Sequence, residues 1–182
     1  MGRDGVVLID KPGGITSRRA LDRVLRILHM KRGGHFGSLD PFATGLLCIG
    51  VGQGTKLLPF LQDHPKEYIA QIGFEKTTDT DDCTGVTLAA FPGIVLDKDK
   101  MGAWIEAHTG WIEQTPPVYC AQKLNGTPLY RLKRANHDVT PRSKRVFIAQ
   151  AEVVAYEPDA IEMRVVCSRG TYIRSIARDL GA

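Results

Sequence analysis

The sequence predicts an α+β fold on two observations. Short apolar or alternating segments, which are typical of strands, are separated by irregular loops rather than by the regular strand–helix–strand units that would predict a parallel sheet. Amphipathic stretches with helical spacing lie between some of these segments. The length of 182 residues suggests one domain with a sizeable core, because single cores usually fill at roughly 100–200 residues.

The N-terminal segment predicts a strand followed by a helix. Residues 6–10 form a short apolar run that ends in a Pro-Gly-Gly turn. Thr16 or Ser17 can cap a helix whose apolar residues recur at i, i+3, i+4 and i+7. Residues 33–34, both glycine, are expected to stop this helix.

The following segments predict a strand, a helix and a second strand. Residues 46–51 form a short apolar strand, and residues 55–61 are expected to be helical. Apolar and polar side chains alternate over residues 68–74, as on a half-buried strand, so that periodicity alone makes Tyr68 a core residue. Residues 77–85 form a turn-rich loop.

The C-terminal half predicts a helix, a hairpin turn, two paired strands and a final helix. Asp97 can cap the first helix, and the Asn-Gly pair at residues 125–126 is a hairpin signal. Residues 145–156 and 161–167 are expected to pair as strands. Residues 173–180 carry an apolar helical face.

Charge is distributed unevenly along the chain. The 24 Lys and Arg against 20 Asp and Glu give a net charge of +4. Residues 16–34 hold six basic side chains and one acid, residues 123–145 hold seven and one, and residues 75–113 are acidic. This pattern fits a phosphate-rich partner such as nucleic acid, and two solvated surface faces are the alternative interpretation.

Several classes of protein are disfavoured. No apolar run approaches the roughly 18 residues of a membrane helix, and residues 1–10 do not resemble a signal peptide. The four cysteines include no C-x-x-C pair, so we expect free thiols in a reducing cytoplasm and no zinc site. The chain has no Walker or G-x-G-x-x-G loop, which disfavours nucleotide-dependent enzymes.

The chemistry concentrates in residues 31–45, where four glycines surround one carboxylate, Asp40. Pro41 biases Asp40 to an extended backbone, and neighbouring glycines allow a ligand to approach closely. Asp40 is therefore a candidate nucleophile or base. An Asp-Pro turn without a functional role is the alternative.

The segment GGHFGSLDPFATG, residues 33–45, resembles the signature G-H-x-G-x-L-D-P-x-A-x-G of the TruB family of pseudouridine synthases. Five further segments resemble family motifs in the same order: KPGGITS from residue 11, KEY from 66, TDTD from 78, QTPP from 114 with Lys123 and Gly126, and SRGTYIR from 168. The resemblance implies a pseudouridine-synthase-type mixed, largely antiparallel sheet flanked by helices and loops. It also implies isomerisation of the T-loop uridine (uridine-55) of tRNA to pseudouridine, without a guide RNA, a cofactor or a metal.

The resemblance assigns roles to single residues. Asp40 matches the catalytic aspartate, which acts on the uridine while its N-glycosidic bond breaks, and Arg174 matches the arginine that pairs with it. Tyr68 matches the tyrosine that stacks on the flipped-out base, and Tyr172 matches a second aromatic residue near that base. His35 matches the histidine that helps to hold the everted loop.

Other residues are expected to support the site or to contact RNA. Lys11 and Pro12 would support the active-site loop. Residues 117–145 correspond to an insertion that grips the RNA stem-loop. Its candidate backbone contacts are Lys123, Arg142, Lys144 and Arg145. The basic helix face at residues 18–31 is a second candidate contact.

The expected partner is the T-arm of tRNA; no obligatory protein partner is expected, and the chain is expected to be a monomer. Family members continue past the Asp-Leu-Gly at residues 179–181, so residues 1–182 are expected to be a catalytic domain without its end and without the C-terminal RNA-binding domain.

Three other functions compete with this interpretation. A truncated chain could bind or fold a T-arm without turnover. The chain could also be a catalytic subunit that depends on a guide RNA, which we consider the less favoured alternative. A carboxylate-dependent hydrolase would need a second acid. Asp79, Asp81 and Asp82 are available, in a loop that we interpret as structural.

Overall fold

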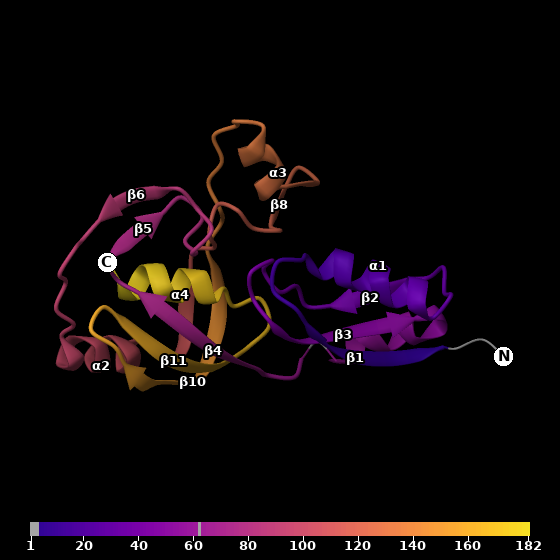
Figure 1. Cartoon of the computed structure of the whole chain (residues 1–182), viewed down its shortest axis with the longest axis horizontal. Helices are drawn as coiled ribbons and strands as arrows, with labels where there is room; N and C mark the ends of the chain where they lie inside the picture. The colour runs from indigo at the N-terminus through magenta and orange to yellow at the C-terminus, as the bar shows by residue number, and fades with distance from the viewer. Residues whose placement is uncertain (1–3, 62) are drawn as a thin grey trace. The chain divides into compact units, whose positions relative to one another are not determined.

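The computed structural model describes residues 4–61 and 63–182, which form two compact units, Met1–His64 and Pro65–Ala182 (Figure 1). Each unit has a buried apolar cluster of its own. The predicted α+β class is confirmed, and every strand pair among the described residues is antiparallel. In these two ranges no helix is long and apolar enough to cross a membrane.

In the part of the first unit that the structure describes, a three-stranded sheet in the order β1-β3-β2 is accompanied by one α-helix and one 3₁₀-helix. In chain order its elements are β1 (Gly5–Lys11), α1 (Ser17–Ile27), β2 (Gly33–Phe36), β3 (Gly45–Val51) and η1 (Gly52–Leu61). The helix expected over residues 55–61 is thus a longer 3₁₀-helix, in which Pro59 has no N–H to donate.

Helix α1 packs on the sheet through its apolar side. Its residues Ala20 and Leu21 form a buried cluster with Leu47, Ile49 and Val51 of β3. The N-terminus is capped as predicted, because the Thr16 hydroxyl accepts a hydrogen bond of 3.1 Å from the backbone N–H of Arg19.

One prediction for this unit is wrong, because Gly33 and Gly34 do not stop the helix. Helix α1 ends at Ile27, and His29 has a left-handed φ of 54°. The two glycines belong to β2. A Cβ at Gly33 would lie 2.7 Å from the side chain of Leu25, so close packing of helix on strand explains the glycine at this position.

The second unit is built on a four-stranded sheet in the order β4-β11-β10-β7, with two short hairpins and three helices. In chain order its elements are β4 (Lys66–Gly73), β5 (Lys76–Thr78), β6 (Thr87–Ala90), α2 (Lys98–Ala107), β7 (Gly110–Gln114), β8 (Lys123–Leu124), β9 (Thr127–Pro128), α3 (Leu129–Arg134), β10 (Lys144–Tyr156), β11 (Ala160–Cys167) and α4 (Ile173–Leu180).

The core of this unit lies between the four-stranded sheet and helices α2 and α4. Met101 of α2 and Ile176 of α4 pack with the buried residues of β10 and β11, among them Ile148, Met163 and Val165. The predicted pairing of residues 145–156 with 161–167 is confirmed as β10 with β11.

The caps and turns of this unit also follow the prediction. Asp97 caps α2 by accepting a hydrogen bond of 3.1 Å from the N–H of Lys100. Asn125 and Gly126, with φ of 50° and 83°, form the turn of the β8–β9 hairpin. The expected free thiols are found as well, since all four cysteines are unpaired with one another.

Candidate active site

Asp40 lies in the first unit, in the loop between β2 and β3. Its backbone carbonyl accepts a hydrogen bond of 3.1 Å from the N–H of Ala43, which closes a four-residue turn with Pro41 in its second position. The Asp40 side chain is half-buried. The Asp-Pro turn and the candidate carboxylate are therefore features of one and the same loop.

Two buried side chains hold the residues on either side of Asp40. The Lys11 ammonium, which is 0% exposed, donates to the carbonyls of Ile15 at 2.8 Å and Pro12 at 2.9 Å and, at 3.3 Å, to that of Pro41. The Ser17 hydroxyl accepts from the N–H of Leu39 at 2.9 Å and donates to its carbonyl at 3.1 Å. The backbone that carries Asp40 is thus fixed from both directions.

Lys11 and Asp40 interact electrostatically. Burial lowers the pKa of Lys11, and the negative charge of Asp40 opposes that shift. Lys11 therefore anchors the loop through hydrogen bonds and also places a positive charge near its carboxylate.

His35 lies in β2, a few residues before Asp40, and is half-buried. Its Nδ1 lies 2.6 Å from the carbonyl oxygen of Gly37, and since a carbonyl can only accept, Nδ1 carries the proton. The bond fixes the orientation of the ring and leaves Nε2 as the atom available to a ligand.

Arg174 lies in the first turn of α4, in the second unit, and is only 9% exposed. Its guanidinium donates to the carbonyls of Thr80 at 2.9 Å and Tyr119 at 3.2 Å, and Nη1 lies 3.7 Å from a carboxylate oxygen of Asp82. A buried cation held by fixed acceptors is well placed to orient a carboxylate ligand.

The acids of the loop after β5 are used for structure. One carboxylate oxygen of Asp82 accepts from the hydroxyl of Thr80 at 2.8 Å and from the N–H and hydroxyl of Thr84 at 2.9 and 2.6 Å. Asp79 accepts from the N–H of Val86 at 2.7 Å. These contacts support the structural interpretation of the loop and disfavour a hydrolase that would need one of these acids free.

Asp81 has a contact of a different kind, an ion pair with Arg178 of α4 at 3.0 Å. Burial raises the pKa of Asp81, and Arg178 acts against this rise. The ion pair joins the loop to the same helix that carries Arg174.

Tyr172 occupies the position just before the first residue of α4 and is held by two neighbours. Gln114, which is buried at the end of β7, accepts from the Tyr172 N–H at 2.8 Å and donates to its carbonyl at 3.1 Å. The Lys144 ammonium lies 4.3 Å from the centre of the Tyr172 ring. The ring also packs against the small apolar cluster of the insertion, formed by Cys120, Leu129 and Val139.

Tyr68 lies on β4, opposite Val165 of β11, and is half-buried. It packs against the main core of the second unit, on the same face of the strand as Ala70 and Ile72. Tyr68 therefore lies on the core side of the strand, as the alternation of residues 68–74 predicts, and part of its side chain is still accessible to a ligand.

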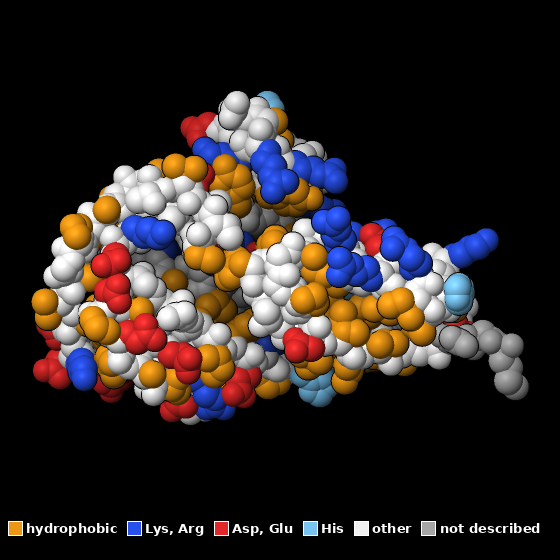
Figure 2. Space-filling model, viewed as in Figure 1, with side chains coloured by type: hydrophobic (Ala, Val, Ile, Leu, Met, Phe, Trp, Pro, Cys, Tyr) orange, Lys and Arg blue, Asp and Glu red, His pale blue; other side chains and the backbone are white. Residues whose placement is uncertain are grey.

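The basic side chains expected to contact RNA differ in exposure. Lys123, Arg142 and Arg145 are exposed, whereas Lys144 is half-buried. Gln122 fixes the backbone of Arg142 through two hydrogen bonds of 2.7 and 2.8 Å. Figure 2 shows Lys and Arg side chains gathered over α1 and, in the second unit, over the segment around α3.

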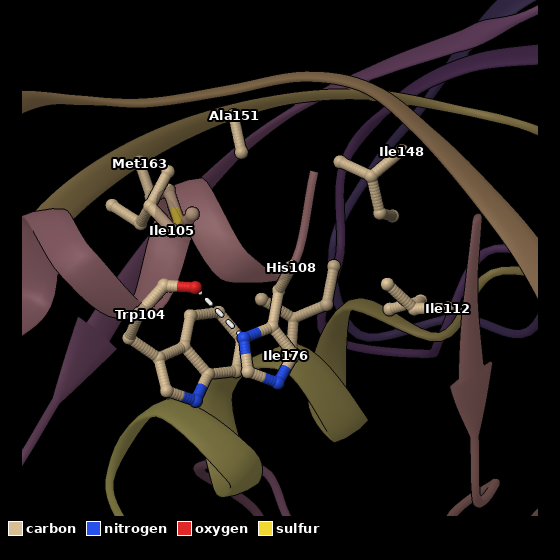
Figure 3. A pocket seen from close by; sticks show the side chains of 8 residues that line it. All are labelled: Trp104, Ile105, His108, Ile112, Ile148, Ala151, Met163 and Ile176. Carbon is tan, nitrogen blue, oxygen red and sulfur yellow. Dashed lines mark hydrogen bonds between the residues drawn. The ribbon is translucent and has the colours of Figure 1, made fainter. Parts of the chain in front are cut away.

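The pocket in Figure 3 lies inside the second unit and is a packing gap. It is lined by apolar side chains such as Ile148 and Met163, and its volume of about 10 Å³ would hold no more than one water molecule. The rings of Trp104 and His108 stack beside it at 3.8 Å, and His108 Nδ1 donates to the Trp104 carbonyl at 2.7 Å. The pocket is too small for a pyrimidine base.

The candidate residues are divided between the two units. Asp40, His35, Lys11 and Pro12 belong to the first unit. Tyr68, Tyr172, Arg174 and the basic residues Lys123, Arg142, Lys144 and Arg145 belong to the second. Among the described residues no group of three or more His, Cys, Asp or Glu side chains could hold a metal ion.

Two residues were not predicted to support the site, Ser17, which was considered only as a possible helix cap, and Gln114. Both are polar and almost fully buried, at 4% and 1% exposure. Each belongs to a segment that resembles a family motif, and a polar residue inside such a segment is the signal that could have identified it.

Comparison with known proteins defines the class of this protein. Residues 25–173 match the N-terminal domain of the TruB family of pseudouridylate synthases. The chain is 43% identical over 181 residues to the tRNA pseudouridine synthase B of Saccharophagus degradans, and 44% identical over 178 residues to that of Aromatoleum aromaticum. The chain therefore belongs to the TruB family, as the motifs indicate.

The relatives are longer than this chain. Both alignments cover 98% of the chain but only 58% of the relative, so the chain spans about three-fifths of the length of these proteins.

Solved structures share the fold. The crystal structure of a Cbf5-Nop10-Gar1 complex contains a chain that matches with a TM-score of 0.72 and 25% identity, over 97% of this chain and 43% of that one. A chain in an H/ACA RNP bound to a substrate RNA containing 2'-deoxyuridine matches with a TM-score of 0.69 and 24% identity, over 97% and 42%.

Proposed function

We propose that this chain is the catalytic domain of a tRNA pseudouridine synthase that converts the T-loop uridine, uridine-55, without a guide RNA. Membership of the TruB family supports the proposal, as do the names of the curated relatives. The observation that carries it is the anchoring of the Asp40 loop, because Lys11 and Ser17 hold the backbone on both sides of a half-exposed carboxylate. Such preorganisation is what a catalytic group requires.

The reaction is an isomerisation in which one bond to the ribose replaces another. The bond from N1 of uracil to C1' breaks, the detached base rotates, and a bond from C5 to C1' forms. C5 gives up its proton and N1 takes one up, so the reaction is a balanced isomerisation and the hydrogen released from C5 can be followed as a label. Asp40 would act on the uridine during breakage of the N-glycosidic bond.

The other candidate residues would hold the reacting groups. Arg174 would pair with Asp40 and orient its carboxylate. Tyr68 would stack on the flipped base, Tyr172 would lie near it, and His35 would help to hold the everted loop. Pro12 would help to support the active-site loop through its carbonyl, which accepts a hydrogen bond from Lys11.

The T-arm would be held mainly through its phosphates. The exposed side chains of Lys123, Arg142 and Arg145 lie in or beside the insertion at residues 117–145 and are available for such contacts. The basic face of α1 would be a second contact region.

The test is formation of pseudouridine in a T-arm minihelix labelled with tritium at C5. We expect the unsubstituted chain to release tritium, and Asp40→Asn to abolish release while leaving minihelix affinity within about twofold. Asp99→Asn, an exposed position on α2, is the matched control and should retain full turnover. Release by Asp40→Asn at the rate of the unsubstituted chain would refute the catalytic role of Asp40.

A second candidate function is T-arm binding without turnover, for which the exposed basic side chains of Lys123, Arg142 and Arg145 would suffice. The full-length Saccharophagus degradans relative serves as the positive control in the same assay. If the relative releases tritium and the chain binds the minihelix without release, the binding function replaces the proposed one.

A further inference from the structure

Lys144 faces the inside of the second unit although its neighbour faces outwards. It is the first residue of β10, and along this strand Val146 and Ile148 are buried while Arg145 and Phe147 are exposed. The alternation of a strand places Lys144 on the same side as the two buried residues. Its ammonium lies 4.3 Å from the centre of the Tyr172 ring, which is the geometry of a cation–π contact.

The contact belongs to a small cluster that fixes Tyr172. Lys144 is the register partner of Gln114 in the β10–β7 pair, and Gln114 binds the backbone N–H and carbonyl of Tyr172. Gly170 completes the cluster, since a Cβ at this position would lie only 3.0 Å from the Lys144 ammonium. One strand pair therefore holds both the backbone and the ring of Tyr172.

We propose that Lys144 is a positioning residue that fixes the Tyr172 ring beside the flipped base, instead of contacting an RNA phosphate. The inference rests on the proposed function, in which Tyr172 lies near the base. Since the ammonium occupies one side of the ring and Gln114 fixes the backbone, the ring has a defined orientation before RNA binds.

The surroundings of Lys144 agree with an internal role. Burial lowers the pKa of Lys144, and the nearby thiol of Cys120 counteracts this effect. Lys123, by contrast, is exposed and available to phosphates.

The chain provides a closely matched control. Lys98 lies over the ring of Tyr156 at the same distance, 4.3 Å, but both residues are exposed and lie at the start of α2 and the end of β10. Lys98→Met therefore removes the same kind of contact from a place that the proposed function does not use.

The experiment compares Lys144→Met, Lys144→Arg and Lys98→Met with the unsubstituted chain. We expect Lys144→Met to move the NMR signals of the Tyr172 ring in the free protein and to slow single turnover at saturating minihelix about 5- to 30-fold. The slope of log affinity against log salt should stay unchanged, and Lys144→Arg should restore most of the rate. Lys98→Met should move only the Tyr156 signals.

Two outcomes would count against the inference. A salt slope reduced by about one unit with an unchanged saturating rate would make Lys144 a phosphate contact. Unmoved Tyr172 signals in Lys144→Met would overturn the positioning role; if this variant does not fold, Lys144→Gln takes its place. If the unsubstituted chain forms no pseudouridine, the proposed function has failed, and the Tyr172 signals still decide whether Lys144 holds the ring.

Discussion

Replacing Lys11 with methionine tests how the candidate carboxylate is held. Methionine keeps much of the length of the side chain but donates no hydrogen bond, so the carbonyls of Pro12, Ile15 and Pro41 lose their charged donor. Two of the bonds are short, at 2.9 and 2.8 Å, and hydrogen bonds to charged groups contribute roughly 1.5–3 kcal/mol each. Because the variant no longer buries an ammonium, we expect a net loss of about 3 kcal/mol in the free energy of unfolding.

The pH dependence of this loss has a definite sign. Burial lowers the pKa of Lys11 in the folded chain, so between that pKa and its ordinary value of 10.5 the unfolded chain binds more protons than the folded one. The contribution of Lys11 therefore makes the free energy of unfolding rise with pH through this window. Lys11→Met should lack this rise.

The measurements are urea unfolding at several pH values and amide hydrogen exchange of residues 39–43. Lys56→Met, at an exposed position of η1, is the control and should change the unfolding free energy by less than about 0.5 kcal/mol. A loss below about 1 kcal/mol for Lys11→Met, with unchanged exchange at residues 39–43, would refute the anchoring role of Lys11.

Three further substitutions or reactions test other parts of the structure. Ser17→Ala removes both hydrogen bonds to Leu39 and should cost about 1–2 kcal/mol in urea unfolding; a neutral result would mean that the loop is held without them. Asp82→Ala should open the loop after β5, seen as faster amide exchange of residues 78–85, whereas unchanged exchange would contradict the structural interpretation of this acid. In thiol titration the exposed Cys83 should react first, and Cys167, whose pKa is raised by burial, should react only at more alkaline pH or after unfolding; equal rates would contradict the burial.

The elements with strong periodicity could be predicted from the sequence. Helix α1, helix α4 and the β10–β11 pair have long apolar faces, and their patterns specify them directly. Strands β6 and β7 were missed, because β6 is exposed along its whole length and β7 is a short strand fixed by its pairing with the distant β10. The division of the chain into two compact units was not predicted either, since no change in composition marks it.

The residues of the candidate site could be predicted from the sequence, but the hydrogen-bond partners that hold them could not. Motif resemblance singled out Asp40, Arg174 and Lys11, but the acceptors of Arg174 include the carbonyls of Thr80 and Tyr119, and carbonyls are present at every position of any sequence. The orientation of Lys144 could have been predicted from the sequence, because Lys144 has the same parity along the strand as the apolar residues Val146 and Ile148, which are buried. The local excess of basic residues suggested the opposite.

The way in which Lys11, Arg174 and Gln114 are bonded has a consequence for how the sequence can change over time. Each of these side chains binds main-chain carbonyls or amides, which every amino acid supplies, proline lacking only the amide hydrogen. The donor positions are therefore intolerant of replacement, whereas receiving positions such as Ile15 and Tyr119 can drift without loss of the bond. In a saturation-mutagenesis map of the chain, Lys11, Arg174 and Gln114 should tolerate few substitutions, whereas Ile15 and Tyr119 should tolerate many.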